Sequence, residues 1–192
     1  DLIENTIVVF TSDNGGLSTL QRNLRSGPAS CLPLRAGQGW LYEGGIKIPT
    51  IISWPSQITP GTLSDTPITT CDIYPTLLTA TGLIDKSNQS VDGVDLTPLF
   101  EDKELKERSL FWHFPHYHGS GNRPSSSIRK GSFKLIRWYE DGSEELYNLD
   151  TDISEENDLS KVNASKRIEL SNELSRWLKS SGAKLPEVNK NN

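Results

Sequence analysis

The sequence contains no methionine and only two cysteines, Cys31 and Cys71. Two cysteines are too few for the disulfide framework that holds many small secreted domains together. A free cysteine most often serves as a small buried hydrophobe, which is the role we expect for both. Because the chain opens with "DLIENT" and has no initiator methionine, we interpret it as an excerpt from a longer protein.

The sequence also lacks an excess of basic residues and a long apolar run. Lysine and arginine number 20 against 25 aspartates and glutamates, for a formal net charge of -5. This balance argues against nucleic-acid binding, which normally requires a basic face. No apolar run approaches the roughly 20 residues that cross a bilayer, so we expect no membrane span. The length of 192 residues suffices for one ordinary domain with its own core.

One apolar run near the start of the chain ends abruptly in oxygen-bearing side chains. The segment "TIVVF", residues 6–10, predicts a strand covered on both faces, as in a parallel sheet. Asp13 and Asn14 follow it, and ligands of open α/β sheets collect beyond the carboxyl ends of strands. A carboxylate beside an amide carbonyl suits Ca²⁺ or Mg²⁺. The same letters, with Gly15 and Gly16 next, also fit an Asn-Gly hairpin turn, and composition alone does not decide.

Further elements follow from breaker residues and spacing. A strand is predicted over residues 48–54, with Pro49 at its start because proline cannot donate to a ladder. The segment "TTCDIYPTLLTATG", residues 69–82, predicts a helix that ends at Gly82. Short strand-like pieces then follow from residue 109, and Asp141-Gly142 between two of them indicates a hairpin.

A helix is predicted at the end of the chain, where apolar residues recur at helical spacing. Leu170, Leu174, Trp177 and Leu178 fall on one face, and Ile168 falls off it. Asn163 is the expected N-cap and Gly182 the expected stop. The second half of the chain therefore predicts a small antiparallel sheet with one covering helix.

Six segments, taken in order, resemble the sulfatase family of the alkaline-phosphatase superfamily: "FTSDNGG", "LRAGQGWLYEGGIKIP", "CDIYPTLLTATG", "VDGVDLTPLF", "RKGSFKLI" and "ELYNLDTDISEENDLS". The resemblance covers nearly the whole chain. It implies an α/β fold, the C-terminal part of an alkaline-phosphatase-like sulfatase. Residues 1–105 would form the end of the catalytic domain, with the boundary near 103–109. Residues 106–192 would form a small subdomain of antiparallel sheet plus C-terminal helix.

The resemblance also implies a chemistry. Sulfatases hydrolyse sulfate esters with Ca²⁺ and a formylglycine made from a Cys or Ser in a C-x-P-x-R motif. Asp13 and Asn14 match the family's second pair of Ca²⁺ ligands. The nucleophile and the first acidic ligands are expected in the N-terminal remainder of the enzyme, without which this chain would be inactive. The implied substrate is a sulfated small molecule or glycan, and the implied location is extracytoplasmic, either periplasmic or secreted.

Two positions depart from the family's pattern or imitate it. Gln38 stands where the family carries a sulfate-binding lysine, and a glutamine brings no charge to the leaving oxygen. "CLPLR", Cys31 to Arg35, matches C-x-P-x-R by letters. We reject it as the modification site because it follows the "SDNG" segment, whereas the family's motif precedes it, and because Leu34 replaces a small residue.

Three histidines lie together in "WHFPHYHG". His113, and after it His116, are our candidates for contacting the substrate, against the alternative of packing or surface roles. Two other functions stay open at this point. One is a non-catalytic relative that binds sulfated glycans, which Gln38 makes conceivable, and the other is a phosphoryl-transfer member of the superfamily.

Overall fold

The computed structural model describes residues 2–19, 27–83 and 90–187. The chain divides into two compact units. The first unit comprises Asp1–Asp13 and Pro49–Glu107, and the second comprises Asn14–Ile48 and Arg108–Asn192. Residues 14–48 thus group with the C-terminal part of the chain. The predicted boundary near residue 105 concerns the domains of the longer enzyme and stays a prediction.

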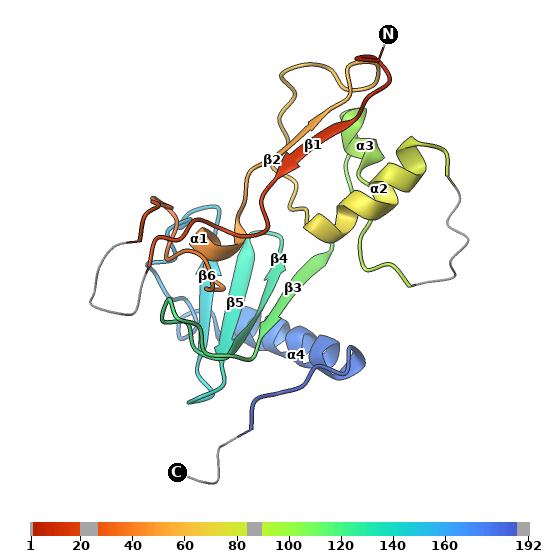
Figure 1. Ribbon diagram of the computed structural model, residues 1–192. Helices are drawn as coiled ribbons and strands as arrows, with labels where there is room; N and C mark the ends of the chain where they lie inside the picture. The colour runs from red at the N-terminus through yellow and green to blue at the C-terminus, as the bar shows by residue number, and fades with distance from the viewer. Residues whose placement is uncertain (1, 20–26, 84–89, 188–192) are drawn as a thin grey trace. The chain divides into compact units, whose positions relative to one another are not determined.

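The first unit contains a two-stranded ribbon and short helices (Figure 1). Strand β1 (Val8–Thr11) pairs with β2 (Thr50–Ser53), and Pro49 precedes β2 as predicted. The predicted helix over 69–82 is present as a 3₁₀ turn, η2 (Thr70–Asp72), followed by α2 (Ile73–Ala80). A last short helix, α3, spans Thr97–Phe100.

Buried Asp72 fixes the start of α2. Its carboxylate accepts hydrogen bonds from the backbone N–H groups of Thr69 at 2.7 Å and Val94 at 2.9 Å. The helix ends before Gly82, which adopts a φ of +66° that an L side chain rarely takes. The sequence placed this helix and its stop correctly, although the capping carboxylate also holds a distant loop.

The expected parallel pairing of the first strand is wrong for the partner that the described residues contain. β1 runs antiparallel to β2, with Val9 opposite Ile52. Val8 and Phe10 are exposed among the described residues, and coverage of both faces in a longer enzyme stays a prediction. A β-branched run reports a strand's tendency to be buried but carries no information about the direction of its partner. The hairpin alternative is also wrong, because β1 pairs with residues 50–53 and not with those directly after Gly16.

The second unit is built on a four-stranded antiparallel sheet in the order β3-β4-β5-β6 (Figure 1). Its strands are β3 (Ser109–Phe114), β4 (Ser125–Lys130), β5 (Phe133–Trp138) and β6 (Glu144–Asn148). The hairpin predicted at Asp141-Gly142 connects β5 to β6, and Gly142 has a φ of +68°. Helix α4 (Ala164–Ser180) has Asn163 as its N-cap, which accepts a hydrogen bond from the Lys166 N–H.

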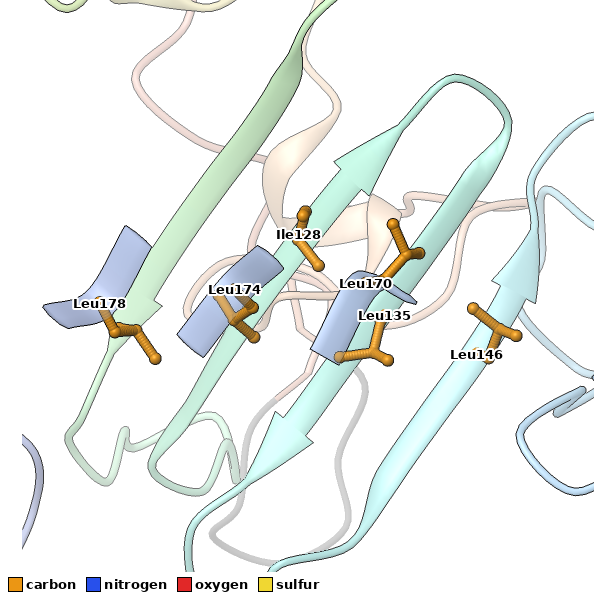
Figure 2. Close-up of a cluster of buried hydrophobic side chains, with 6 residues drawn as sticks. All are labelled: Ile128, Leu135, Leu146, Leu170, Leu174 and Leu178. Atoms are coloured by element: carbon orange, nitrogen blue, oxygen red, sulfur yellow. The ribbon is translucent and has the colours of Figure 1, made fainter. Parts of the chain in front are cut away.

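One face of this sheet packs on α4, and we call it the helix face. Figure 2 shows side chains from three strands turned toward three leucines of α4. All six are buried: Ile128, Leu135, Leu146, Leu170, Leu174 and Leu178. Trp177 stacks on Phe111 beside them, with ring centroids 4.8 Å apart, and Ile168 points away and is exposed. The predicted apolar face of the helix is confirmed.

The opposite face of the sheet, which we call the loop face, packs on residues 35–46. Tyr42 joins a second buried cluster there with Ile136, Trp138, Tyr147 and Leu149. The segment ends in the short helix α1 (Glu43–Ile46). The sheet is therefore covered by a helix on one side and by the glycine-rich segment on the other.

Both cysteines are free, and neither is buried. Cys31 is half-buried, where its thiol lies 3.4 Å from the Gly16 carbonyl oxygen, and Cys71 is exposed. The expectation of two small buried hydrophobes is therefore wrong. Cys71 lies in η2, a short turn that buries only Asp72.

Candidate functional site

The predicted metal ligands lie where the chain leaves β1. Asp13 is exposed and Asn14 is half-buried, and the division between the two units falls between them. The chain beyond Asn14 is fixed against α1, because the Gly15 N–H donates to the Gly45 carbonyl at 2.9 Å. A Cβ at Gly15 would lie 1.8 Å from the Gly44 oxygen, so this close approach requires glycine.

The loop that carries Gln38 lies against the same stretch. The backbone N–H of Gln38 donates to the Gly16 carbonyl at 2.9 Å, and the Ser18 N–H donates to the same oxygen. Gln38 therefore hydrogen-bonds to Gly16, which lies two residues after Asn14 in the sequence. Asn14 and Gln38 belong to the same unit.

The donor set fits a hard cation in kind but not in number. A carboxylate and an amide carbonyl in neighbouring positions are the oxygen ligands that Ca²⁺ takes, and Ca²⁺ usually takes six to eight. In the described ranges, no group of three or more His, Cys, Asp or Glu side chains is arranged to hold a metal. Asp13 and Asn14 could thus supply part of a calcium site, whose remaining ligands would have to come from elsewhere.

The contacts of the two candidate histidines, His113 and His116, involve neither Asn14 nor Gln38 in the hydrogen bonds and ring contacts described below. His113, on β3, has both ring nitrogens within hydrogen-bond distance of groups in its own unit. Nδ1 lies 2.7 Å from the Ser126 hydroxyl, and Nε2 lies 3.0 Å from the Lys184 carbonyl. His116 is exposed and meets the Phe114 ring edge-on. A substrate contact by either stays a prediction.

His118 is the histidine that the structure brings to the Gln38 loop, and sequence reasoning missed it. A Cβ at Gly39, the residue after Gln38, would lie 2.2 Å from His118 Nδ1. The Ser120 N–H donates to that nitrogen at 3.2 Å, and the Ser120 hydroxyl lies 2.8 Å from it. Trp40 ties the two loops together by donating from Nε1 to the Ser120 carbonyl at 3.1 Å. Nothing in the spacing of "HFPHYHG" distinguishes His118 from its neighbours.

Arg35 is committed to the loop rather than to an anion. Its guanidinium donates to the Tyr147 hydroxyl at 3.0 Å and to the Glu155 carbonyl at 2.7 Å. It also lies over the Tyr42 ring, 3.9 Å from the centroid. Arg35 therefore fixes this segment onto the sheet, and the rejection of Cys31–Arg35 as a modification motif stays a prediction.

Glu43 enters a buried charge cluster on the loop face. Its carboxylate lies 3.0 Å from the Lys134 ammonium, and that ammonium lies 2.8 Å from Glu155 Oε1. All three side chains are at most 2% exposed. The Glu43 N–H donates to Glu155 Oε2 at 2.6 Å, and Arg129 approaches Glu43 at 3.8 Å. Burial raises the pKa of Glu155, although Lys134 opposes that shift.

A second, partly buried polar group secures the same loop. The hydroxyls of Tyr42 and Tyr147 both donate to Glu145 Oε2, at 2.7 Å and 2.9 Å. Burial, and next the negative charge of Glu145, raise the pKa of each tyrosine well above its ordinary range. Tyr42, which is buried, and Trp40, which is partly buried, therefore anchor the loop, with ring centroids 5.7 Å apart.

Comparison with known proteins identifies the family of this chain. Residues 37–183 match the family described as N-sulphoglucosamine sulphohydrolase, C-terminal. The chain belongs to the sulfatase family. A sulfatase of Formosa agariphila is 36% identical over 92% of this chain and 34% of its own length. Human arylsulfatase A is 34% identical over 69% of this chain and 25% of its own length.

Solved sulfatases share the fold. Ps i-CgsB in complex with k-i-k-neocarrahexaose superposes with a TM-score of 0.71 at 29% identity, covering 91% of this chain and 37% of that one. BT4656 in complex with its substrate D-glucosamine-2-N,6-O-disulfate gives a TM-score of 0.72 at 26% identity, covering 92% of this chain and 34% of that one. The fold is thus that of the C-terminal portion of an alkaline-phosphatase-like sulfatase, as predicted. The chain spans about a third of the length of these relatives.

Within the described residues, no helix combines the length and the apolar character that crossing a membrane requires.

Proposed function

We propose that the longer enzyme of which this sequence forms a part hydrolyses sulfate esters carried on a glycan. The observation that carries the proposal is the joining of two elements in the second unit. The residues after Asn14 and the loop that carries Gln38 are connected through the Gly16 carbonyl. The names of relatives, which include N-acetylgalactosamine-6-sulfatase, support a sulfated glycan as the substrate class.

Asp13 and Asn14 would supply two oxygen ligands to a calcium ion. Bound there, the cation would offset the negative charge of the sulfate group and of the attacking nucleophile. Asp13 contributes a formal negative charge and Asn14 a neutral carbonyl, so together they hold the ion without fully neutralising it. The formylglycine would reside in another part of the enzyme, and an extracytoplasmic location rests on the family resemblance.

Gln38 would orient the sulfate by a neutral hydrogen bond from its amide. Charge-assisted hydrogen bonds are about twice as strong as neutral ones, and losing one preorganised donor typically costs on the order of 10²–10³ in rate. The contacts of Arg35 with Tyr147 and Glu155 leave that side chain occupied elsewhere. We therefore expect hydrolysis to be slower than in a lysine-bearing relative, or specialised for one substrate.

Calcium binding tests the first part of the proposal. Isothermal calorimetry on the full-length enzyme should detect Ca²⁺ uptake, and Asp13→Ala with Asn14→Ala should weaken it by at least about 10²-fold, since even partners of metal ligands contribute about 10–100-fold. Asp65→Ala is a matched control, because it removes an exposed carboxylate from the same unit as Asp13. Unchanged affinity in the double variant would remove these two residues from the metal site.

Substitution of Gln38 tests the second part and separates the alternatives. In the full-length enzyme, Gln38→Lys should raise arylsulfate turnover by about 10²–10³-fold. An unchanged rate would contradict the assignment of this position to the sulfate. Binding of a sulfated oligosaccharide without sulfate release, in both wild type and variant, would favour the non-catalytic relative. Release of phosphate from phosphate esters in place of sulfate would favour the phosphoryl-transfer alternative.

A further inference from the structure

Helix α1 contacts both parts of the proposed site through its backbone. The Gly45 carbonyl accepts from Gly15, next to Asn14. On the other side, the Gly44 N–H donates to Arg35 O at 2.9 Å, and a Cβ at Gly45 would lie 2.1 Å from the Trp40 carbonyl. The backbone of α1 therefore contacts both the stretch that carries Asn14 and the loop that carries Gln38.

Lys134, which is fully buried, ties α1 to the sheet. Lys134 reaches from β5 to Glu43, the first residue of α1, at 3.0 Å, and to Glu155 at 2.8 Å. The carboxylate of Glu155 also accepts a hydrogen bond from the backbone N–H of Glu43. The backbone carbonyl of Glu155 accepts a hydrogen bond from the Arg35 guanidinium. Glu155 adopts a φ of +52°, a conformation unusual for a residue with a side chain, so its place is fixed by these contacts.

Such a cluster is not explained by stability alone. Burying two carboxylates and an ammonium carries a large desolvation cost, and well-packed apolar residues often give equal or greater stability. What these charges provide is a defined geometry, because the Lys134 ammonium lies within 3.0 Å of a carboxylate oxygen of both Glu43 and Glu155. That geometry is transmitted to Gly15 and to the Gln38 loop through a few short backbone contacts.

We propose that Lys134 is a positioning residue of the sulfate site, which fixes the spacing between Asn14 and Gln38 by holding Glu43 and Glu155 together beneath α1. This inference rests on the proposed function for its catalytic readout. It predicts that a residue of the C-terminal sheet, without touching substrate, controls both calcium binding and turnover.

The test uses the full-length enzyme with Lys134→Met, which keeps a long side chain but removes its charge. Calcium affinity and kcat are measured well below the melting temperature, on protein shown to be folded by circular dichroism. We expect both to fall, kcat by about 10²-fold, which is the effect that a displacement of about 1 Å has on a positioned group. KM should change much less than kcat.

Arg137→Met is the matched control. Arg137 lies on the same strand and pairs with Glu144 at 3.0 Å, but it faces α4, where it also bonds to Ser171. Its substitution should lower stability and leave kcat and calcium affinity unchanged. If Lys134→Met behaves like Arg137→Met after allowance for the folded fraction, the positioning role is overturned.

An uncharged triple variant, K134M/E43Q/E155Q, separates positioning from stability. Removing all three charges should recover much of the lost stability. It should not recover kcat, since the fixed distances are gone, and recovery of kcat together with stability would overturn the proposal. Where Lys134→Met does not fold, Glu155→Gln carries the test, because it removes one buried charge and keeps the side-chain shape.

A double-mutant cycle with Gln38→Ala supplies a third readout. If Lys134 acts through the Gln38 loop, the two substitutions should lower kcat/KM less in combination than the product of their separate effects. Multiplicative effects would overturn the coupling. Failure of the proposed function is distinguishable: a wild-type enzyme that releases no sulfate refutes that function, while the calcium affinities of the variants still decide the role of Lys134.

Discussion

The two faces of the four-stranded sheet are held to their covering layers by different forces. On the helix face, six aliphatic side chains interlock, and the ion pair of Arg137 with Glu144 is partly exposed. On the loop face, an aromatic and aliphatic cluster is joined by the fully buried ion pairs of Lys134 with Glu43 and Glu155, and by hydrogen bonds to the half-buried Glu145. Aliphatic cores tolerate repacking, whereas buried charges tolerate little displacement. The face that supports the proposed site is the one with the stricter geometry.

The largest effect should come from the helix face. Leu174→Ala removes a fully buried side chain from the centre of the α4 cluster, and it should lower the free energy of unfolding by about 2–5 kcal/mol. Urea denaturation followed by circular dichroism measures this. Ile168→Ala, at an exposed position of the same helix, should stay within about 0.5 kcal/mol. Similar losses in the two variants would show that α4 does not pack as described.

High pH should weaken the loop face selectively. Tyr42 and Tyr147 have a raised pKa in the folded state, so they stay protonated while the unfolded chain ionises. Their contribution is fully present below the ordinary tyrosine pKa and is lost as the pH rises. Above pH of roughly 10, each should cost about 1.4 kcal/mol of stability per pH unit.

Denaturation curves between pH 8 and pH 11 measure this slope. Tyr42→Phe together with Tyr147→Phe should make the slope shallower, whereas Leu174→Ala should shift the whole curve and leave its slope unchanged. The slope is the quantity to compare, because the phenylalanine variants also lose the hydrogen bonds to Glu145. An unaltered slope would mean that these tyrosines ionise freely in the folded protein.

The same contrast explains what the sequence could predict. The helix face was predicted because Leu170, Leu174 and Leu178 recur at helical spacing, a local pattern that packing then preserves. The hairpin at Asp141-Gly142 was likewise predicted from two adjacent residues that favour one turn. These features depend on neighbours in the chain, so a single sequence contains them.

The loop face could not be predicted in this way. Glu43, Lys134 and Glu155 are far apart in sequence, and no spacing rule pairs them. One signal was present: Lys134 alternates with Ile136 and Trp138 in β5, which places a lysine on a buried face. Asp13 and Asn14 were singled out by their place after a strand, and the family resemblance favoured the metal site over a turn. Gln38 was identified through the resemblance alone, and the roles of all three in binding remain predictions.

The antiparallel partner of β1 was missed for a related reason. Residues 14–48 separate β1 from β2, and this intervening stretch belongs to the other unit. The direction of β2 depends on where the intervening segment ends. The periodicity of residues within β1 carries no information about that position. Local patterns therefore predicted each element, while long excursions determined how the elements pair.

The smallest effect tests whether the helix face can be perturbed alone. Asn163 caps α4 by accepting from the Lys166 N–H at 3.2 Å, and Asn163→Ala should cost about 1 kcal/mol. Asn163→Gly should cost only about 0.3 kcal/mol, because glycine lets water and the backbone satisfy the exposed N–H groups. Since the cap lies on the helix and not on the loop, neither variant should change the alkaline slope set by Tyr42 and Tyr147. A change in that slope would show that the two faces respond as one, and the separation between shape-held and charge-held layers would then fail.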